Sequence, residues 1–256
     1  MNKFFKAAAV AAVSLTLSGA ALAQSALNEI LSDGVLKVGT TGDWNPMSVR
    51  DPATNSYKGF DIDIMAALAA DLGVQVEFVP TDWKTLVNGV VAGQYHITGS
   101  ASISPARMKA AGFSESYISV EIYPFTSKEN AGKFADHDAI NQPGVKVATT
   151  LGTTFEKQVR EWYPNADIKV VEAPARGYQE VLAGRADVFI TSNIEGSTLE
   201  EKFGVARVTG AEARAPTPIA MLLPQDDQVW INYVNNWVKV KQAKGFFEGN
   251  KAKWGL

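Results

Sequence analysis

Cysteine is absent from this chain of 256 residues, and histidine occurs only twice. The lack of cysteine excludes disulfides, thiolate metal sites and cysteine nucleophiles. With only His96 and His137 available, a multi-histidine metal centre or a Ser-His-Asp triad has few residues to draw on. The sequence also shows neither a phosphate-binding loop nor a cluster of metal ligands. We therefore expect no cofactor and no metal.

An excess of positive charge is also missing. The chain has 24 Lys and Arg residues and 27 Asp and Glu residues, which gives a net charge of −3. A mildly acidic protein has no electrostatic reason to seek nucleic acid, so we expect no nucleic-acid partner.

Apolar runs of membrane-spanning length are missing as well. The longest, Ala7–Leu17, is shorter than the roughly 20 apolar residues that cross a bilayer. It follows Lys3 and Lys6 and precedes Ala21-Leu22-Ala23, a pattern typical of a cleaved secretory signal peptide over residues 1–23. An uncleaved anchor is the alternative. Cleavage would start the mature chain at Gln24 and deliver it to the periplasm.

What is present is an alternation of strand and helix patterns, in the order β-α-β-α-β, which occurs twice. Short apolar runs rich in β-branched residues predict the strands, and apolar residues at helical spacing that stop at glycine predict the helices. The first set is Val35–Gly39, Asp61–Leu72, Val74–Val79, Trp83–Ala92 and Tyr95–Thr98. The second set is Val145–Thr149, Thr154–Trp162, Ile168–Val171, Gly177–Ala183 and Asp187–Ile190. One or two helices over Asp226–Phe247 and a loose tail follow.

This order predicts an α/β protein of two lobes with a ligand cleft and a hinge between them, because open α/β sheets bind ligands beyond the carboxyl ends of their strands. We assign residues 24–122 plus 217–256 to lobe 1 and residues 123–216 to lobe 2. The chain would cross between the lobes near Ser119–Phe125 and Pro216–Leu222.

Four segments, in this order along the chain, resemble the family-3 bacterial extracellular solute-binding proteins, whose best-known members serve polar amino-acid ABC transporters. They are Val38–Met47, Gly59–Asp63, Gly99–Arg107 and Gly152–Glu156. The resemblance implies a periplasmic-binding-protein-like fold, a small carboxylate-bearing solute such as an amino acid or a related organic acid, and a membrane-embedded ABC permease as partner. We expect a monomer. Within the family, the chain is most similar to the periplasmic cyclohexadienyl dehydratase branch.

Arg107 is the first candidate for binding a carboxylate. It follows Ser102 by five residues in a loop that leaves a predicted strand at the cleft edge. A guanidinium presents a planar fork of donors that grips a carboxylate with two hydrogen bonds. Ser100, Ser102 and nearby backbone N–H groups could complete the cage. The alternative is a solvated arginine in the first turn of a helix.

Gly152-Thr153-Thr154 lies between a predicted strand and a predicted helix. Helix N-termini attract anions through their free N–H groups. The resemblance implies that Thr154, with Thr153 beside it, touches the same carboxylate from the second lobe. Thr153 and Glu156 also have the spacing of a capping box, which needs no ligand.

Aromatic side chains can line the apolar part of a ligand site. We assign Trp44 and Phe60 to the cleft and leave Trp83 open between cleft and core. The position where the family's amino-acid binders place an ammonium-binding Asp reads Ser192 here. Either another acid, such as Asp43 or Glu195, holds the ammonium, or the ligand has none.

An arogenate or prephenate dehydratase is the alternative function. It needs a general acid, for which Glu156 is the candidate. The dehydratases typically carry Gly-Gly-Thr-Asn-Glu where this chain reads Gly152-Thr153-Thr154-Phe155-Glu156, and they keep the Asp that is Ser192 here. These departures favour a binding protein, which has no catalytic residues.

Overall fold

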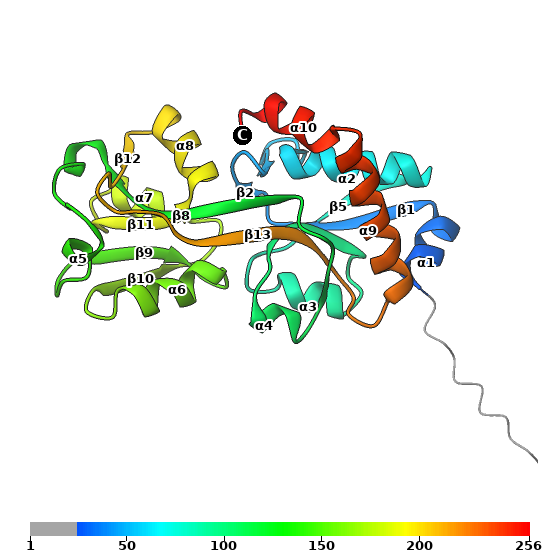
Figure 1. Ribbon diagram of the computed structural model, residues 1–256, viewed down its shortest axis with the longest axis horizontal. Coiled ribbons are helices and arrows are strands. Elements are labelled where there is room, and N and C mark those ends of the chain that lie inside the picture. The colour runs from blue at the N-terminus through cyan, green and yellow to red at the C-terminus, as the bar shows by residue number, and fades with distance from the viewer. Residues whose placement is uncertain (1–24) are drawn as a thin grey trace, which may run out of the picture.

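The computed structural model describes residues 25–256, so the expected signal peptide and its cleavage site lie outside the described part of the chain. A mixed sheet runs along the whole molecule in the order β10-β9-β11-β8-β13-β6-β1-β5, with helices on both of its faces (Figure 1). Its strands are β1 (Val35–Thr40), β5 (Gln75–Pro80), β6 (Ile97–Ser102), β7 (Gly112–Phe113), β8 (Ile118–Ser127), β9 (Lys146–Thr150), β10 (Asp167–Val171), β11 (Val188–Ser192), β12 (Val205–Arg207) and β13 (Arg214–Leu223). A smaller sheet contains β2 (Asp43–Trp44), β3 (Ser48–Arg50) and β4 (Tyr57–Lys58).

The helices are α1 (Ala26–Asp33), α2 (Phe60–Leu72), α3 (Leu86–Val91), α4 (Pro105–Met108), α5 (His137–Ile140), α6 (Thr154–Trp162), α7 (Gly177–Leu182), α8 (Asn193–Lys202), α9 (Gln228–Ala243) and α10 (Phe246–Trp254). None of the helices in the described part of the chain has the length and apolarity needed to cross a membrane.

The two predicted β-α-β-α-β sets form two groups of parallel strands. In the first, β1 pairs in parallel with β5 and β6. In the second, β9 pairs in parallel with β10 and β11. The helix α2 ends, as predicted, at Gly73, whose left-handed φ of 72° is accessible to glycine at little cost. The expectation of an α/β fold is therefore confirmed.

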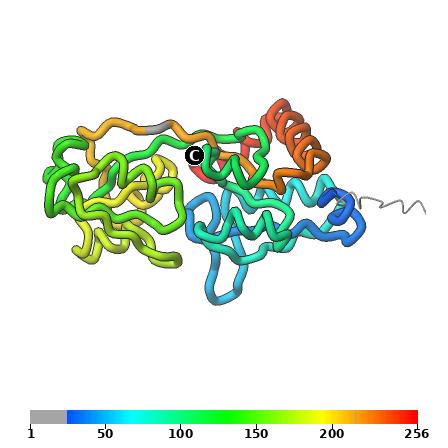
Figure 2. The backbone as a smooth tube through the Cα atoms, turned by 90° about the horizontal axis from the view of Figure 1, so that it is seen from below, coloured from blue at the N-terminus to red at the C-terminus, as the bar shows by residue number. Residues whose placement is uncertain are grey.

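Two long antiparallel strands, β8 and β13, join the two groups of elements. They pair with each other, while β8 also pairs with β11 of the second group and β13 with β6 of the first. Figure 1 shows them side by side along the length of the molecule, and Figure 2 shows the two groups from below with these strands between them. The predicted crossovers, residues 119–125 and 216–222, lie within these strands.

The C-terminal segment differs from the prediction. The residues expected to be a loose tail form α10, which follows α9 after a left-handed Gly245. The reason is packing, because the Phe247 ring stacks on Tyr117 at 5.6 Å and meets the Trp237 ring at 6.2 Å. Phe247 is buried in the main hydrophobic cluster, so the tail completes the core of the first group.

Candidate functional site

A cavity lies where the first group of elements meets the second. It contains about 310 Å³ of space, part of which is open to solvent. Its lining comes from β2, the turn before α3, β6, α4 and the beginnings of α6 and α7: Trp44, Trp83, Ser100, Ser102, Arg107, Thr153, Thr154, Phe155 and Arg176. A wider space of about 1100 Å³ adjoins it and shares Trp83, Arg107, Thr153 and Thr154.

Arg107 forms the cationic wall of this cavity. Ser104 caps the short helix α4 and places Arg107 in its first turn. The side chain is buried, with Nη1 donating to the Ser102 carbonyl at 3.3 Å. Burial lowers the pKa of Arg107 to about 10, so it remains a cation at neutral pH. No carboxylate of residues 25–256 forms an ion pair with it.

Across the cavity from Arg107, the N-terminus of α6 presents Thr153 and Thr154. Thr153 is the N-cap: its hydroxyl accepts from the Glu156 backbone N–H at 3.3 Å and donates to the Thr150 carbonyl at 2.7 Å. The Glu156 carboxylate accepts from the Gly152 backbone N–H at 3.1 Å. The Thr153 cap is therefore present, but Glu156 accepts from Gly152 and not from the Thr153 backbone N–H, so the reciprocal half of the capping box is not formed. The Thr154 side chain faces the cavity with no protein hydrogen bond of its own among the described residues.

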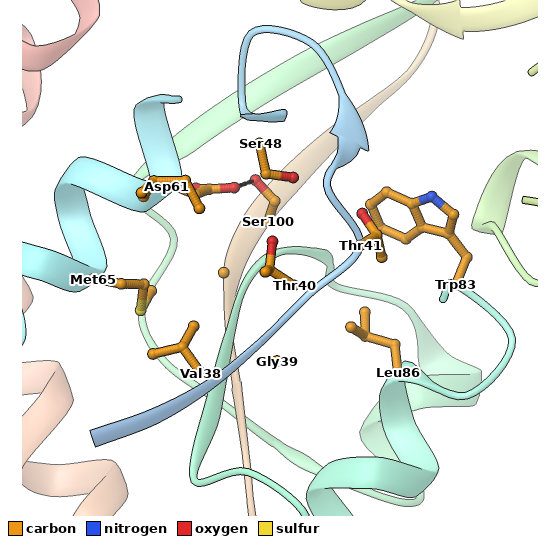
Figure 3. A pocket seen from close by; sticks show the side chains of 12 residues that line it. Val38, Gly39, Thr40, Thr41, Ser48, Asp61, Met65, Trp83, Leu86 and Ser100 are labelled. Atoms are coloured by element: carbon orange, nitrogen blue, oxygen red, sulfur yellow. Dashed lines mark hydrogen bonds between the residues drawn. The ribbon is translucent and has the colours of Figure 1, made fainter. Parts of the chain in front are cut away.

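Ser100 connects the cavity to a buried carboxylate behind it. Figure 3 shows Ser100 and Asp61 pointing toward one another, and the serine hydroxyl donates to Asp61. The Tyr117 hydroxyl donates to the other Asp61 oxygen at 2.8 Å and accepts from the Ser100 backbone N–H at 2.8 Å. Burial without a cation raises the pKa of Asp61 to about 7. The Ser100 hydroxyl is thus engaged by Asp61.

Arg176, which was not among the predicted site residues, lies at the N-cap of α7 and links the two groups of elements. Its Nη2 donates to both oxygens of Glu195, at 2.9 and 2.8 Å, and its Nη1 donates to Asp43 at 3.1 Å. Although burial lowers the pKa of Arg176, the two acids outweigh it, so the pKa is raised and the guanidinium stays charged. A cation at a helix N-terminus opposes the helix dipole. The arginine directly before the predicted helix was therefore the feature of the sequence that could have indicated a role for Arg176.

The aromatic residues divide between the cavity and the core. Trp44 and Trp83 line the cavity and meet edge to face at 6.0 Å, and the Trp83 indole N–H donates to Asp43 at 3.0 Å. Phe155, at the start of α6, adds a third aromatic wall that the sequence did not reveal.

Comparison with known proteins agrees with this arrangement. Residues 36–256 match the family of bacterial extracellular solute-binding proteins, family 3. The chain belongs to this family. It is 32% identical to the cyclohexadienyl dehydratase of Pseudomonas aeruginosa over 251 residues, which cover 96% of this chain and 92% of that protein. It is 24% identical to the L-cystine-binding protein TcyJ of Escherichia coli (strain K12), over 89% of this chain and 85% of the relative.

A solved structure is similar along most of the chain. It is the crystal structure of the ancestral amino acid-binding protein AncCDT-1, a precursor of cyclohexadienyl dehydratase. The TM-score is 0.84 at 35% identity, covering 90% of this chain and 99% of the other. The expected periplasmic-binding-protein fold of this family 3 solute-binding protein is therefore confirmed.

The structure places two predicted site residues away from the cavity. Phe60 has no exposed surface and packs in the core beside Tyr117, because it begins α2, which packs against the sheet. Ser192 is likewise fully buried, and its hydroxyl caps α8 by accepting from the Glu195 backbone N–H at 3.2 Å. In this arrangement neither Phe60 nor Ser192 lines the cavity to which the sequence assigned it.

Asp43 and Glu156 are close to the cavity but engaged by protein partners. Asp43 accepts from Trp83 and Arg176. Glu156 accepts from Gly152 and from Arg160, whose Nη2 lies 3.3 Å away. The predicted residues that line the cavity together are Trp44, Ser100, Ser102, Arg107, Thr153 and Thr154.

Proposed function

We propose that this chain is the periplasmic substrate-binding component of an ABC transporter and that it holds a small carboxylate-bearing solute between its two lobes. One observation carries the proposal: Arg107 is a buried cation on a cavity wall, with no acidic partner among residues 25–256. A buried charge is costly unless it is paired, so the cavity is suited to an anion.

The bound carboxylate would lie between Arg107 and the N-terminus of α6. The guanidinium offers two parallel donors from one side. Free backbone N–H groups and the Thr154 hydroxyl offer donors from the other, where the helix dipole also favours negative charge. Because these donors belong to different lobes, one anion would draw the lobes together. Trp44, Trp83 and Phe155 would contact the apolar part of the solute.

Closure would bend the chain in β8 and β13, the strands that join the lobes. We assign lobe 1 to residues 24–122 plus 217–256 and lobe 2 to residues 123–216. The protein would act as a monomer that presents its closed form to a membrane-embedded permease, after export and removal of residues 1–23. Intact mass of the periplasmic protein tests the processing, for which a chain starting at Gln24 is expected.

A thermal-shift screen of the mature protein against amino acids, organic acids and prephenate tests the binding function. A solute that binds only the native state adds about 2.7 kcal/mol of stability at 100 times its dissociation constant. The radius of gyration from small-angle scattering should decrease in the complex, because the solute would shift the molecules that are still open to the closed arrangement. If no carboxylate in the screen raises the melting temperature, the proposed function is wrong.

A dehydratase is the second candidate, favoured by the 32% identity to the Pseudomonas aeruginosa enzyme. Glu156 is its predicted general acid, but its carboxylate accepts from the Gly152 backbone N–H and pairs with Arg160. Burial raises the pKa of Glu195, as a general acid requires, yet both of its oxygens accept from Arg176. We expect no conversion of arogenate or prephenate above background. Steady turnover that disappears in Glu156→Gln or Glu195→Gln would establish the enzyme instead.

A further inference from the structure

The charged residues that line the cavity are all cations. Arg107 and Arg176 contribute to its wall, and none of its nine lining residues is an acid. A site that holds an amino acid has to balance two opposite charges, the α-carboxylate and the α-ammonium. This cavity supplies charge for the carboxylate alone, since the remaining polar lining consists of the neutral hydroxyls of Ser100, Ser102, Thr153 and Thr154.

Two acids beside the cavity, Asp43 and Glu195, already have partners on every carboxylate oxygen. The two oxygens of Asp43 accept from the Trp83 indole at 3.0 and 3.1 Å, and Oδ2 also accepts from Arg176. Glu195 accepts from Arg176 through both oxygens and from the Thr191 hydroxyl. Both side chains are less than a tenth exposed. Arg176 balances the charge of both acids, and each of their oxygens already accepts from the protein, so neither acid presents an unpaired negative charge to a ligand ammonium.

Arg176 is also held firmly in place. Its backbone N–H donates to the Gln179 side chain at 2.9 Å at the start of α7, and its guanidinium spans from Glu195 to Asp43. A ligand ammonium could reach the acids only by displacing this guanidinium. An ammonium that stopped short of them would face a like charge in a partly dry site, which disfavours binding.

We propose that Arg176 takes the place of a ligand ammonium, so that the cavity selects carboxylic acids that lack an α-amino group, such as 2-oxo and 2-hydroxy acids with an apolar or aromatic side chain. This inference rests on the proposed binding function and names its ligand class. It also accounts for Ser192. An acid at this position would bind a ligand ammonium, whereas a ligand without an ammonium needs no acid there, and the Ser192 hydroxyl caps α8.

Matched pairs of acids test the inference by calorimetric titration at pH 7.5. Phenylpyruvate and 3-phenyllactate are compared with phenylalanine, and 4-methyl-2-oxopentanoate with leucine. In each pair only the α-substituent differs, while the carboxylate and the side chain are the same. We expect the 2-oxo and 2-hydroxy acids to bind at least about tenfold more tightly than the amino acid.

Variants at position 176 then locate the cause. Arg176→Met frees Asp43 and Glu195, so the preference should fall toward parity or reverse. Arg176→Lys keeps the charge and should keep the preference. Arg185→Met is the matched control, because Arg185 lies in the same lobe, is exposed and pairs only with Glu180 among the described residues. If Arg176→Met does not fold, the selectivity of the parent protein still decides.

The outcomes separate the two proposals. If the parent binds phenylalanine or leucine as tightly as the matching 2-oxo acid, the inference is overturned while the carboxylate-binding function stands. If Arg176→Met folds and keeps the full preference, Arg176 is not its cause and the inference is again overturned. If no acid of either kind binds, the carboxylate-binding function fails and the inference fails with it.

Discussion

The Arg176 guanidinium and the Asp43 carboxylate join two parts of the chain that are 133 residues apart, with 3.1 Å between Nη1 and Oδ2. Asp43 belongs to the small sheet beside β1, and Arg176 begins α7 next to β9 and β11. Both side chains are buried, so this contact between the lobes is shielded from solvent. We expect this contact to hold the lobes together in the arrangement that the structure shows.

Replacing Asp43 should therefore loosen the closed arrangement. In Asp43→Asn the hydrogen bond to Arg176 loses its charge, and such bonds contribute about 1.5–3 kcal/mol. The ratio of closed to open molecules should fall by roughly 10- to 150-fold, since each 1.4 kcal/mol is a factor of ten. Small-angle scattering of the ligand-free variant should give a larger radius of gyration than the parent.

Glu172→Gln is the control for this experiment. It weakens a second ion pair between the lobes, Lys84–Glu172, in which both side chains are more than half exposed. Exposed pairs contribute about 0–1 kcal/mol, so its radius should match the parent. An unchanged radius in Asp43→Asn as well would mean that the buried pair does not hold the lobes together.

Arg107→Ala tests the anion site. Truncating one partner of a buried charge pair costs about 2–5 kcal/mol. Affinity for the solute found in the screen should therefore fall by a factor of about 30 to several thousand. Arg107→Lys should recover part of the loss, because an ammonium lacks the planar fork. Lys109→Ala removes an exposed charge two residues away and should bind like the parent. Titration calorimetry measures all three; Arg107→Ala binding within about twofold of the parent would place the site elsewhere.

A substitution at Gly152 tests how closely the two lobes approach each other. A Cβ at this position would lie 2.5 Å from the backbone of Lys84, which belongs to the opposite lobe, and φ is +77°. Gly152→Ala should therefore obstruct closure and lower ligand affinity at least about tenfold, in addition to the roughly 1–2 kcal/mol cost of a left-handed alanine.

Gly144→Ala separates these two effects. Gly144 has a similar φ of +82°, but no atom lies within 4 Å of its would-be Cβ. Both variants should lose thermal stability, and only Gly152→Ala should lose affinity in calorimetry. Equal affinities of Gly152→Ala and Gly144→Ala would show that the Lys84 backbone moves aside and that the lobes still close.

The sequence predicted the elements whose signals are local. The helix Thr154–Trp162 has the predicted bounds, because the residues that start it, the Thr153 cap and Glu156, are close together in the sequence. Arg107 was predicted in a loop that leaves a strand; it lies instead in the first turn of α4, which Ser104 and Pro105 start, with its side chain buried. Both segments line the cavity.

Features that depend on distant partners were not predicted. The glycine- and lysine-rich end of the chain gave no sign of α10, whose Phe247 finds Tyr117 only after folding. Phe60 was assigned to the cleft because the segment after Gly59 resembled a site motif, but its ring points into the core. The role of Arg176 depends on Asp43, which is remote in sequence.

The buried Asp61 carboxyl group beside the cavity should make the unfolding free energy depend on pH. It is 4% exposed, and its hydrogen-bond donors, Ser100 and Tyr117, are neutral. Burial raises its pKa from 3.8 in the unfolded chain to about 7 in the folded protein. A raised folded-state pKa means that the folded protein binds the proton more tightly than the unfolded chain does. The associated stabilisation is complete below about pH 4 and is lost as the pH rises through 7.

Over this window the folded protein should lose roughly 4 kcal/mol of unfolding free energy on account of Asp61, at 1.36 kcal/mol per pH unit. Asp61→Asn mimics the neutral acid, so the difference in unfolding free energy between the variant and the parent should grow in favour of the variant from pH 4.5 to 8. Urea denaturation at several pH values measures it. Asp51→Asn is the control: Asp51 is exposed and its pKa is lowered by the Ala53 backbone N–H, so its contribution changes below pH 4, outside the window. A pH-independent difference for Asp61→Asn would show that Asp61 keeps its charge at neutral pH, stabilised by Ser100 and Tyr117.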